Sequence, residues 1–183
     1  MTQLRYEAPS TLDAAIALLA GSKGQVRVLA GGTDVIVQMQ TDAIEPELIV
    51  DIKKIPELCR IAAEGGGLRV GAAVTCMELI EHNGFDGVQL IGSIQVKGRA
   101  TLGGNLCNAS PAADSVPALV AAGAVATIVG PNGRRELPVE KIPTGPGTTS
   151  LAPGEIVTSI LLPSRPPRSG DAYQRFTPRT EMD

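Results

Sequence analysis

The sequence contains very few aromatic residues and no tryptophan. Aromatic side chains make up 2% of the 183 residues, whereas hydrophobic residues as a whole make up 43%. The core must therefore be built from aliphatic side chains. A flat ligand ring would lie mainly against aliphatic side chains or backbone rather than in an aromatic cage.

Histidine is almost absent as well, and this limits the catalytic classes. The only histidine, His82, lies at the polar end of a short predicted helix. Ser-His-Asp and Cys-His catalytic sites both require a histidine, so the sequence does not favour either. It also lacks the lysine-bearing phosphate loop and any G-x-G-x-x-G that follows a strand and opens a helix.

Three cysteines, Cys59, Cys76 and Cys107, form no C-x-x-C pair. Their number and spacing argue against a disulfide framework, a structural zinc site and an iron–sulfur cluster held by this chain alone. We therefore expect reduced thiols that serve as buried packing residues, and no metal ligands.

Long apolar runs and an excess of positive charge are also missing. The formal net charge is -3 and the isoelectric point is near 5.2, which does not favour nucleic acid or an anionic membrane as a partner. No segment approaches the roughly 18 apolar residues of a membrane helix, and the start of the sequence lacks the apolar region of a signal peptide. The expected location is the cytoplasm.

Several helices can be predicted from periodicity and capping residues. Residues 10–21 place apolar side chains on one face, with Ser10 as the expected N-cap and Gly21 at the end. Residues 75–82 carry a capping box in which Thr75 is the N-cap and Glu78 completes the pair. The segment 115–124 is expected to be a third helix, with Pro117 in its first turn.

Strands alternate with these helices without a regular βαβ period. Residues 47–52 and 68–74 are expected strands, the first buried on both faces, and the segments 124–129 and 134–139 indicate a hairpin through Asn132 and Gly133. Later strands are expected at 155–163 and from 172 to the end of the sequence. The pattern predicts an α+β fold with two small lobes, residues 1–60 and 61–183.

Two glycine pairs stand out as candidate phosphate-binding segments. The first is "AGGTD" at 30–34 and the second is "TLGGN" at 101–105. Glycine permits a positive φ and lets an anion approach successive backbone N–H groups, while Thr33, Thr101 and Asn105 add side-chain donors. The alternative is that each pair only serves a tight turn.

Three residues after the second glycine pair each have more than one interpretation. Asp114 is either the N-cap of the helix near Val116 or an acceptor for ligand hydroxyl groups. Cys107 and Asn108 are expected to pack and cap the loop rather than to act as nucleophile and base. The segment 144–155 is expected to be a surface loop or a partner contact.

Four stretches carry a resemblance to a known family: "VLAGGTDV", "IGSIQVKGRATLGGNLCNASPAADSVPAL", "TGPGTTSLAPGEIV" and "YQRFTPRTEMD". With their spacing they cover nearly the whole chain and resemble the FAD-binding medium subunit of the molybdenum hydroxylases, the xanthine dehydrogenase and carbon monoxide dehydrogenase group. That resemblance implies the α+β FAD-binding fold shared with vanillyl-alcohol oxidase and p-cresol methylhydroxylase. FAD is the implied cofactor.

The resemblance also implies which residues bind FAD. Its diphosphate would lie on the two glycine segments, Asp114 would contact the flavin moiety, Ile91 would pack near the isoalloxazine, and Val157 and Arg175 would be later contacts. The complete set is Ala30, Gly31, Gly32, Thr33, Asp34, Ile91, Thr101, Leu102, Gly103, Gly104, Asn105, Asp114, Val157 and Arg175. No catalytic acid or base is implied.

The implied role is electron transfer within an enzyme complex. A large molybdopterin subunit oxidises the substrate, a small iron–sulfur subunit passes on the electrons, and the flavin of this subunit delivers them to an external acceptor. A flavin-free remnant or assembly module is the alternative, and an independent flavin or nucleotide oxidoreductase is a third reading. The sequence departs from the family pattern at "EHNGFDGVQ", which is shortened, and the family's C-terminal domain is expected to be absent.

Overall fold

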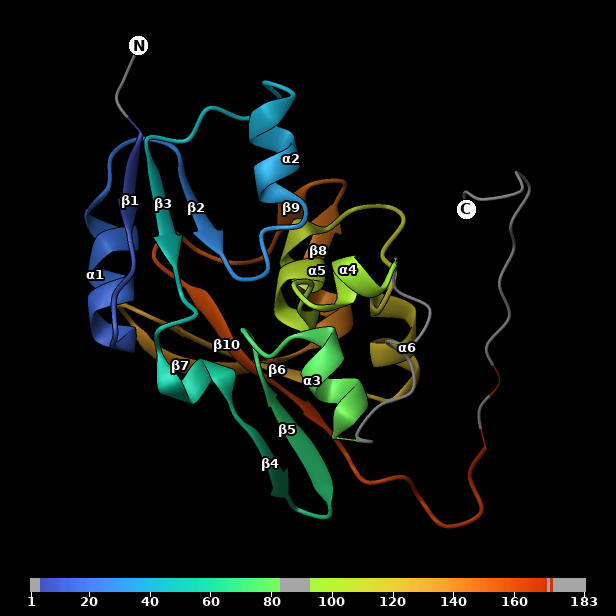
Figure 1. The fold of residues 1–183 in the computed structure, drawn as a ribbon. Coiled ribbons are helices and arrows are strands. Elements are labelled where there is room, and N and C mark those ends of the chain that lie inside the picture. Colours follow the sequence, from blue (N-terminus) through green and yellow to red (C-terminus); the bar gives the residue numbers. More distant parts are fainter. Residues whose placement is uncertain (1–3, 83–92, 171, 173–183) are drawn as a thin grey trace.

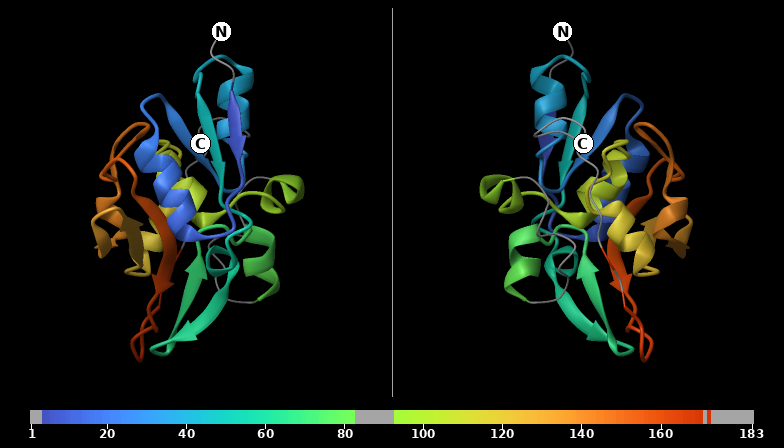
Figure 2. Two further views of the ribbon diagram at one scale, coloured as in Figure 1. Left: turned by 90° about the vertical axis from the view of Figure 1, so that its left-hand side faces the viewer. Right: turned by 90° about the vertical axis from the view of Figure 1, so that its right-hand side faces the viewer.

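A computed structural model of the chain describes residues 4–82, 93–170 and 172. It contains two main sheets at opposite ends of the molecule, with short helices between and beside them (Figure 1). The two side views show the same separation of the sheets (Figure 2). None of the helices in the described part has the length and apolar character needed to cross a membrane.

The first sheet is three-stranded and parallel, in the order β1-β3-β2. Its strands and helices are β1 (Arg5–Glu7), α1 (Leu12–Gly21), β2 (Val26–Leu29), α2 (Val35–Gln40) and β3 (Leu48–Asp51). All four residues of β3 are buried, as expected for a central strand covered on both faces. Helix α1 begins after Thr11, whose side chain accepts a hydrogen bond from Ala14 N, so the prediction that Ser10 is the N-cap was wrong.

The second sheet is five-stranded and antiparallel, in the order β4-β5-β10-β6-β7. Its strands are β4 (Ile61–Glu64), β5 (Gly67–Gly71), β6 (Val125–Gly130), β7 (Gly133–Pro138) and β10 (Ile156–Leu162). The hairpin between β6 and β7 is present, with Gly130 paired to Gly133. The register of β10 shifts at Thr158, which is a β-bulge beside Val157.

Short helices and a small hairpin complete the fold. The predicted capping box of α3 is confirmed: Thr75 accepts from Glu78 N, and Glu78 accepts from Thr75 N. The remaining elements are η1 (Pro56–Cys59), α3 (Cys76–Glu81), α4 (Ile94–Lys97), α5 (Leu102–Asn108), α6 (Val116–Ala121), η3 (Val139–Lys141), β8 (Pro143–Gly145) and β9 (Thr148–Thr149). The strand predicted from 172 onward lies outside the described residues, apart from 172 itself, which is not in a strand.

The core consists of two aliphatic clusters. The larger one lies between the second sheet and helices α3, α5 and α6, with Leu79, Leu106, Leu119 and Ile128 fully buried. The smaller one joins α1 to β3, but it also includes Ala73 and Ile156, which belong to the side of the second sheet. Strand β10 therefore supplies Ile156 to one cluster and Val157 to the other, and so couples the two sheets.

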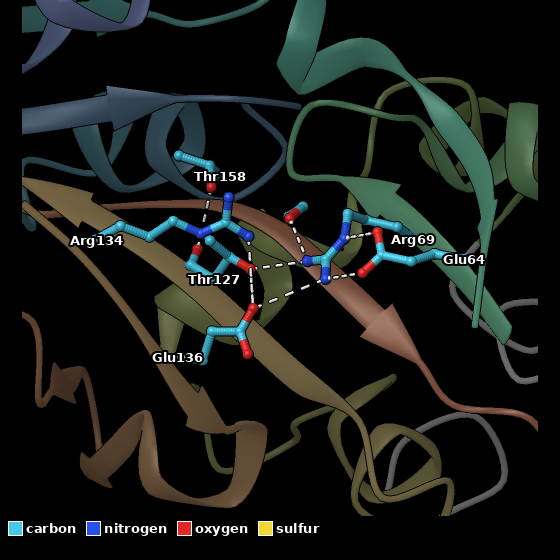
Figure 3. Close-up of polar contacts among 7 residues, drawn as sticks. Glu64, Arg69, Thr127, Arg134, Glu136 and Thr158 are labelled. Atoms are coloured by element: carbon cyan, nitrogen blue, oxygen red, sulfur yellow. Dashed lines mark hydrogen bonds and ion pairs between the residues drawn. The ribbon is translucent and has the colours of Figure 1, made fainter.

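The opposite face of the second sheet carries a polar cluster around Arg69 of β5 (Figure 3). The Arg69 guanidinium makes two hydrogen bonds to Glu64, donates to Thr127 Oγ1 (2.8 Å) and to Ser159 Oγ (3.0 Å), and lies 3.8 Å from Glu136. Its side chain is only 17% exposed. One arginine thus ties together side chains from all five strands of this sheet.

Candidate functional site

The first glycine segment connects β2 to α2. Gly32 has φ +83°, a backbone conformation that favours glycine, and a Cβ at this position would meet the Ile36 and Leu29 side chains at 3.0 and 3.1 Å. The N–H groups of residues 31 to 34 donate to no other residue in the described part of the chain. These groups are therefore available to a ligand.

Gly31 brings this segment into direct contact with the chain before α5. A Cβ on Gly31 would lie 2.1 Å from the Arg99 carbonyl oxygen and 2.8 Å from its carbon, so only glycine permits the approach. In addition, Arg99 Nε donates to the Gly31 carbonyl oxygen at 3.4 Å. Two segments far apart in the sequence are thereby held side by side.

The second glycine segment is the first turn of helix α5, and not the tight turn that was the alternative interpretation of the sequence. Thr101 is the N-cap, and its Oγ1 accepts from Gly104 N at 2.9 Å. A Cβ on Gly103 would lie 2.8 Å from both the Ala72 Cβ and the Ala72 carbonyl oxygen. Tertiary contact therefore explains the glycine, since the helix must lie directly against Ala72.

Asn105 of α5 organises the chain that follows the helix. Its Oδ1 accepts from Ser115 N (3.1 Å) and Ser115 Oγ (2.7 Å), and its Nδ2 donates to Asp114 Oδ2 (3.3 Å). Ser115, not Asp114, occupies the N-cap position of α6, and no side chain caps that helix. The N-cap interpretation of Asp114 was therefore wrong.

Both glycine segments line one cavity of about 780 Å³ between β2, α2, α5 and the β8–β9 hairpin. We call it the intersheet cavity. Of the candidate residues, those that line it are Ala30, Gly31, Gly32, Thr33, Asp34, Thr101, Gly103, Gly104, Asn105, Asp114 and Val157. Leu102 instead points its side chain into the larger core cluster, and Ile91 and Arg175 lie outside the described residues.

Several lining residues were not identified from the sequence. Gly147, Thr149 and Leu151 come from the segment predicted to be a surface loop or partner contact, and Arg27 comes from β2. Gln38 and Asn108 also face the cavity, on α2 and α5. Their sequence context gave no signal, because their shared location depends on how the two sheets pack.

Carboxylates outnumber cations on the cavity wall. Among the described residues, the charged side chains that line it are Asp34, Asp114, Glu155 and Arg27. Loss of hydration raises the pKa of Asp34; the Thr33 hydroxyl partly counteracts this, and the charge of Asp114 adds to it. Glu155 is neutralised by Arg135, whose two hydrogen bonds (2.8 and 2.7 Å) hold the Glu155 pKa below its ordinary value.

Two of the three cysteines line the cavity as protonated thiols. Burial raises the pKa of Cys76 to about 11 and that of Cys107 to about 12. Cys59 is exposed, so its predicted role in buried packing was wrong. Across the described residues, no group of three His, Cys, Asp or Glu side chains is placed to hold a metal ion.

The donor set of the intersheet cavity suits a dinucleotide with a diphosphate. Successive N–H groups along a glycine backbone have no acceptor among the described residues, and glycine leaves no side chain that would keep a phosphate away. Aliphatic residues such as Ala72 and Val157 form other parts of the wall and suit an uncharged ring. Fold and cavity together define an α+β protein with a dinucleotide-type site.

Comparison with known proteins identifies the family. The family described as "FAD binding domain in molybdopterin dehydrogenase" matches residues 2–165, and the chain therefore belongs to it. The α+β FAD-binding fold expected from the sequence motifs is confirmed.

Individual relatives agree with this assignment. The xanthine dehydrogenase FAD-binding subunit of Escherichia coli O157:H7 is 36% identical over 188 residues, covering 97% of this chain and 64% of the relative. The structure of carbon monoxide dehydrogenase from Hydrogenophaga pseudoflava superposes with a TM-score of 0.91 at 30% identity, covering 97% of this chain and 65% of that one. The structure of quinoline 2-oxidoreductase from Pseudomonas putida 86 superposes with a TM-score of 0.82 at 26% identity. This match covers 89% of this chain and 60% of that one. The chain thus spans just under two thirds of the length of these proteins.

Proposed function

We propose that this chain binds FAD in the intersheet cavity and is the flavoprotein part of a molybdopterin-dependent hydroxylase or dehydrogenase. The observation that carries the proposal is the convergence of two glycine segments on one cavity, with backbone N–H groups that have no partner in the described chain. Membership of the FAD-binding family supports FAD over other dinucleotides.

The residues of the two glycine segments would have different roles in binding the cofactor. The N–H groups of Gly31, Gly32, Thr33 and Asp34 would hold the diphosphate, and that of Gly103, which donates to no described residue, would add to them. This arrangement needs no lysine, and none is among the described residues that line the cavity. Ala30, Thr101 and Gly104 would keep the backbone in place.

Asp114 would accept hydrogen bonds from hydroxyl groups of the cofactor. Asn105 orients the Asp114 carboxylate through a hydrogen bond of 3.3 Å, and is itself fixed by Ser115. Val157 would pack against the flavin ring system, and we retain Ile91 and Arg175 as proposed contacts. Bound FAD supplies two-electron redox chemistry, so this chain needs no catalytic acid or base of its own.

The proposed partners follow from the kind of enzyme to which the relatives belong. A large molybdopterin subunit would oxidise the substrate, a small iron–sulfur subunit would pass electrons to the flavin, and an external acceptor would receive them. Relatives named as a medium chain or a subunit support this division. No nucleic-acid or membrane partner is proposed, and the proposed location is the cytoplasm. We also propose that residues 1–60 and 61–183 act as the two lobes of the cofactor site.

The test is flavin retention by the purified chain. The protein is mixed with FAD, desalted, and its flavin absorbance is compared with that of two variants. Gly32→Ala places a Cβ at a positive φ in the cavity wall, whereas Gly65→Ala places one at φ +57° in the β4–β5 turn with nothing within 4 Å. We expect wild type and Gly65→Ala to retain FAD and Gly32→Ala to lose it.

The alternative function, a flavin-free assembly module, predicts a different result. Such a protein would retain no flavin on its own or in a complex with a molybdopterin subunit and an iron–sulfur subunit. A purified, intact complex that contains this chain but no flavin would therefore overturn the proposed electron-transfer role.

A further inference from the structure

A hydrogen bond between two side chains joins helix α2 to helix α5 across the intersheet cavity. Gln38 Nε2 on α2 donates to Asn108 Oδ1, the side chain of the last residue of α5, at 3.0 Å. The two residues are seventy positions apart in the sequence, and both line the cavity. The bond is partly buried, so water competes with it less than at the surface.

The α2 side of this bond is weakly packed. Helix α2 has six residues, none of them buried, and Ile36 and Val37 are 42% and 53% exposed. A helix of this length has little stability of its own and depends on tertiary contacts. The position of α2 therefore rests on few contacts, of which the Gln38 side chain supplies one.

The α5 side is firmly held. Leu106 is fully buried in the larger core cluster, and the chain after Asn108 turns away through Ala109 at φ +50°. The Ala109 carbonyl oxygen then accepts from Gly147 N at 2.9 Å, which fixes the end of the helix to the β8–β9 hairpin. The bond thus ties a weakly packed helix to a rigid one.

We propose that the Gln38–Asn108 hydrogen bond is a latch that holds the intersheet cavity closed and sets the rate at which FAD enters and leaves it. This inference rests on the proposed function for its ligand, but the latch itself can be tested without FAD. Gln38 acts here as a positioning residue, through its effect on α2. Its backbone oxygen accepts from Ala43 N at 2.8 Å, and a side-chain substitution leaves that contact in place.

Cys107 provides a probe of cavity opening. Its side chain lies next to Asn108 on the cavity wall and is partly buried, whereas Cys59 is exposed and serves as an internal reference. The apo protein is treated with iodoacetamide, and the labelling of each cysteine is followed by peptide mass spectrometry. Far-UV circular dichroism and thermal unfolding verify that each variant is folded.

The variants are Gln38→Met, Asn108→Leu and the double variant, with Gln40→Met as the matched control. Methionine keeps the length and helix propensity of glutamine but removes the donor, and Gln40 is an exposed residue of the same helix that does not line the cavity. Loss of one such bond should speed Cys107 labelling about fivefold in Gln38→Met. Equal Cys107 rates in Gln38→Met and Gln40→Met would overturn the latch.

FAD release from the loaded protein gives the second measurement. Each single variant should release FAD about fivefold faster than wild type, and the double variant no faster than either, since all three break the same bond. If the increases in the FAD release rate of the two single variants multiply in the double variant, Gln38 and Asn108 make separate contacts with the cofactor. That result would overturn the latch. A wild-type chain that retains no FAD would overturn the proposed function, while the Cys107 rates would still decide whether the latch exists.

Discussion

Replacing Gly31 by alanine tests whether the cavity depends on close backbone contact between its two walls. The added Cβ would lie 2.1 Å from the Arg99 carbonyl oxygen, 2.8 Å from its carbon and 3.0 Å from the Ala100 Cα. All three atoms are backbone, so no side-chain rotation relieves the overlap. The two segments must therefore separate, which also disturbs the Arg99–Gly31 hydrogen bond.

The size of the effect follows from the overlap. Restoring an ordinary contact requires a shift of about 1 Å between packed segments, and overpacking of this kind costs about 2 kcal/mol. For a chain of this size that corresponds to a fall in the unfolding temperature of about 4 to 8 °C. Because the same contact positions the N–H groups of the first glycine segment, FAD retention should fall as well.

The matched control is Gly98→Ala, one residue before Arg99. Gly98 has φ −66°, and a Cβ there would meet only ordinary contacts at 3.7 and 3.9 Å. Thermal unfolding by circular dichroism and flavin retention after desalting are measured for both variants. If the unfolding temperature of Gly31→Ala lies within about 1 °C of that of Gly98→Ala, a Cβ at position 31 does not force the two segments apart.

Three further predictions concern charge. Burial opposes ionisation of Asp51, but hydrogen bonds from Lys53 and Tyr6 outweigh it and lower the pKa of this carboxyl. Asp51→Asn should therefore lower the free energy of unfolding by about 2 kcal/mol at pH 7, as measured by urea unfolding. The difference between wild type and variant should shrink as the pH falls through the depressed pKa of Asp51, because the wild-type carboxylate then becomes protonated. A difference that does not change with pH would contradict this. Arg69→Met should lower the free energy of unfolding by about 2 kcal/mol, because it removes hydrogen bonds to several strands. The Arg134 side chain is 61% exposed, so Arg134→Met should change the free energy of unfolding by less than about 0.5 kcal/mol. Finally, because carboxylates outnumber cations on the cavity wall, raising NaCl from about 0.05 to about 0.5 M should not weaken FAD binding in a fluorescence titration; a tenfold weakening would mean that unrecognised cations bind the diphosphate.

Local structure was predictable from the sequence where short-range rules decide it. The capping box of Thr75 and Glu78 was read directly from a four-residue pattern, and the continuous apolar run of β3 indicated a strand buried on both faces. The β6–β7 hairpin was found from its turn residues. In each case the decisive partners lie within a few residues of one another, or the strand is mostly apolar.

Prediction failed where distant contacts decide the structure. The glycine pair at 103–104 has low helix propensity, yet it begins α5, because glycine lets the helix lie against Ala72 and Thr101 caps the first turn. The cavity draws its wall from residues between Val26 and Val157, so its shape depends on how the sheets pack. The residues indicated two glycine segments that could share a diphosphate, and the family resemblance assigned it to FAD, but neither gave any indication that Gln38 and Asn108 line the cavity.

The position of β10 has a consequence for how the chain folds. This strand is the centre of the second sheet, pairing with both β5 and β6, yet it is the last strand of that sheet to be synthesised. Until it arrives, the β4–β5 and β6–β7 hairpins expose unpaired edges, which is the state most prone to aggregate. Contacts between strands so far apart in sequence also slow folding. Because Ile156 and Val157 of β10 complete the cavity wall, we expect the cofactor site to form in the final folding step, after the rest of the described chain has been made.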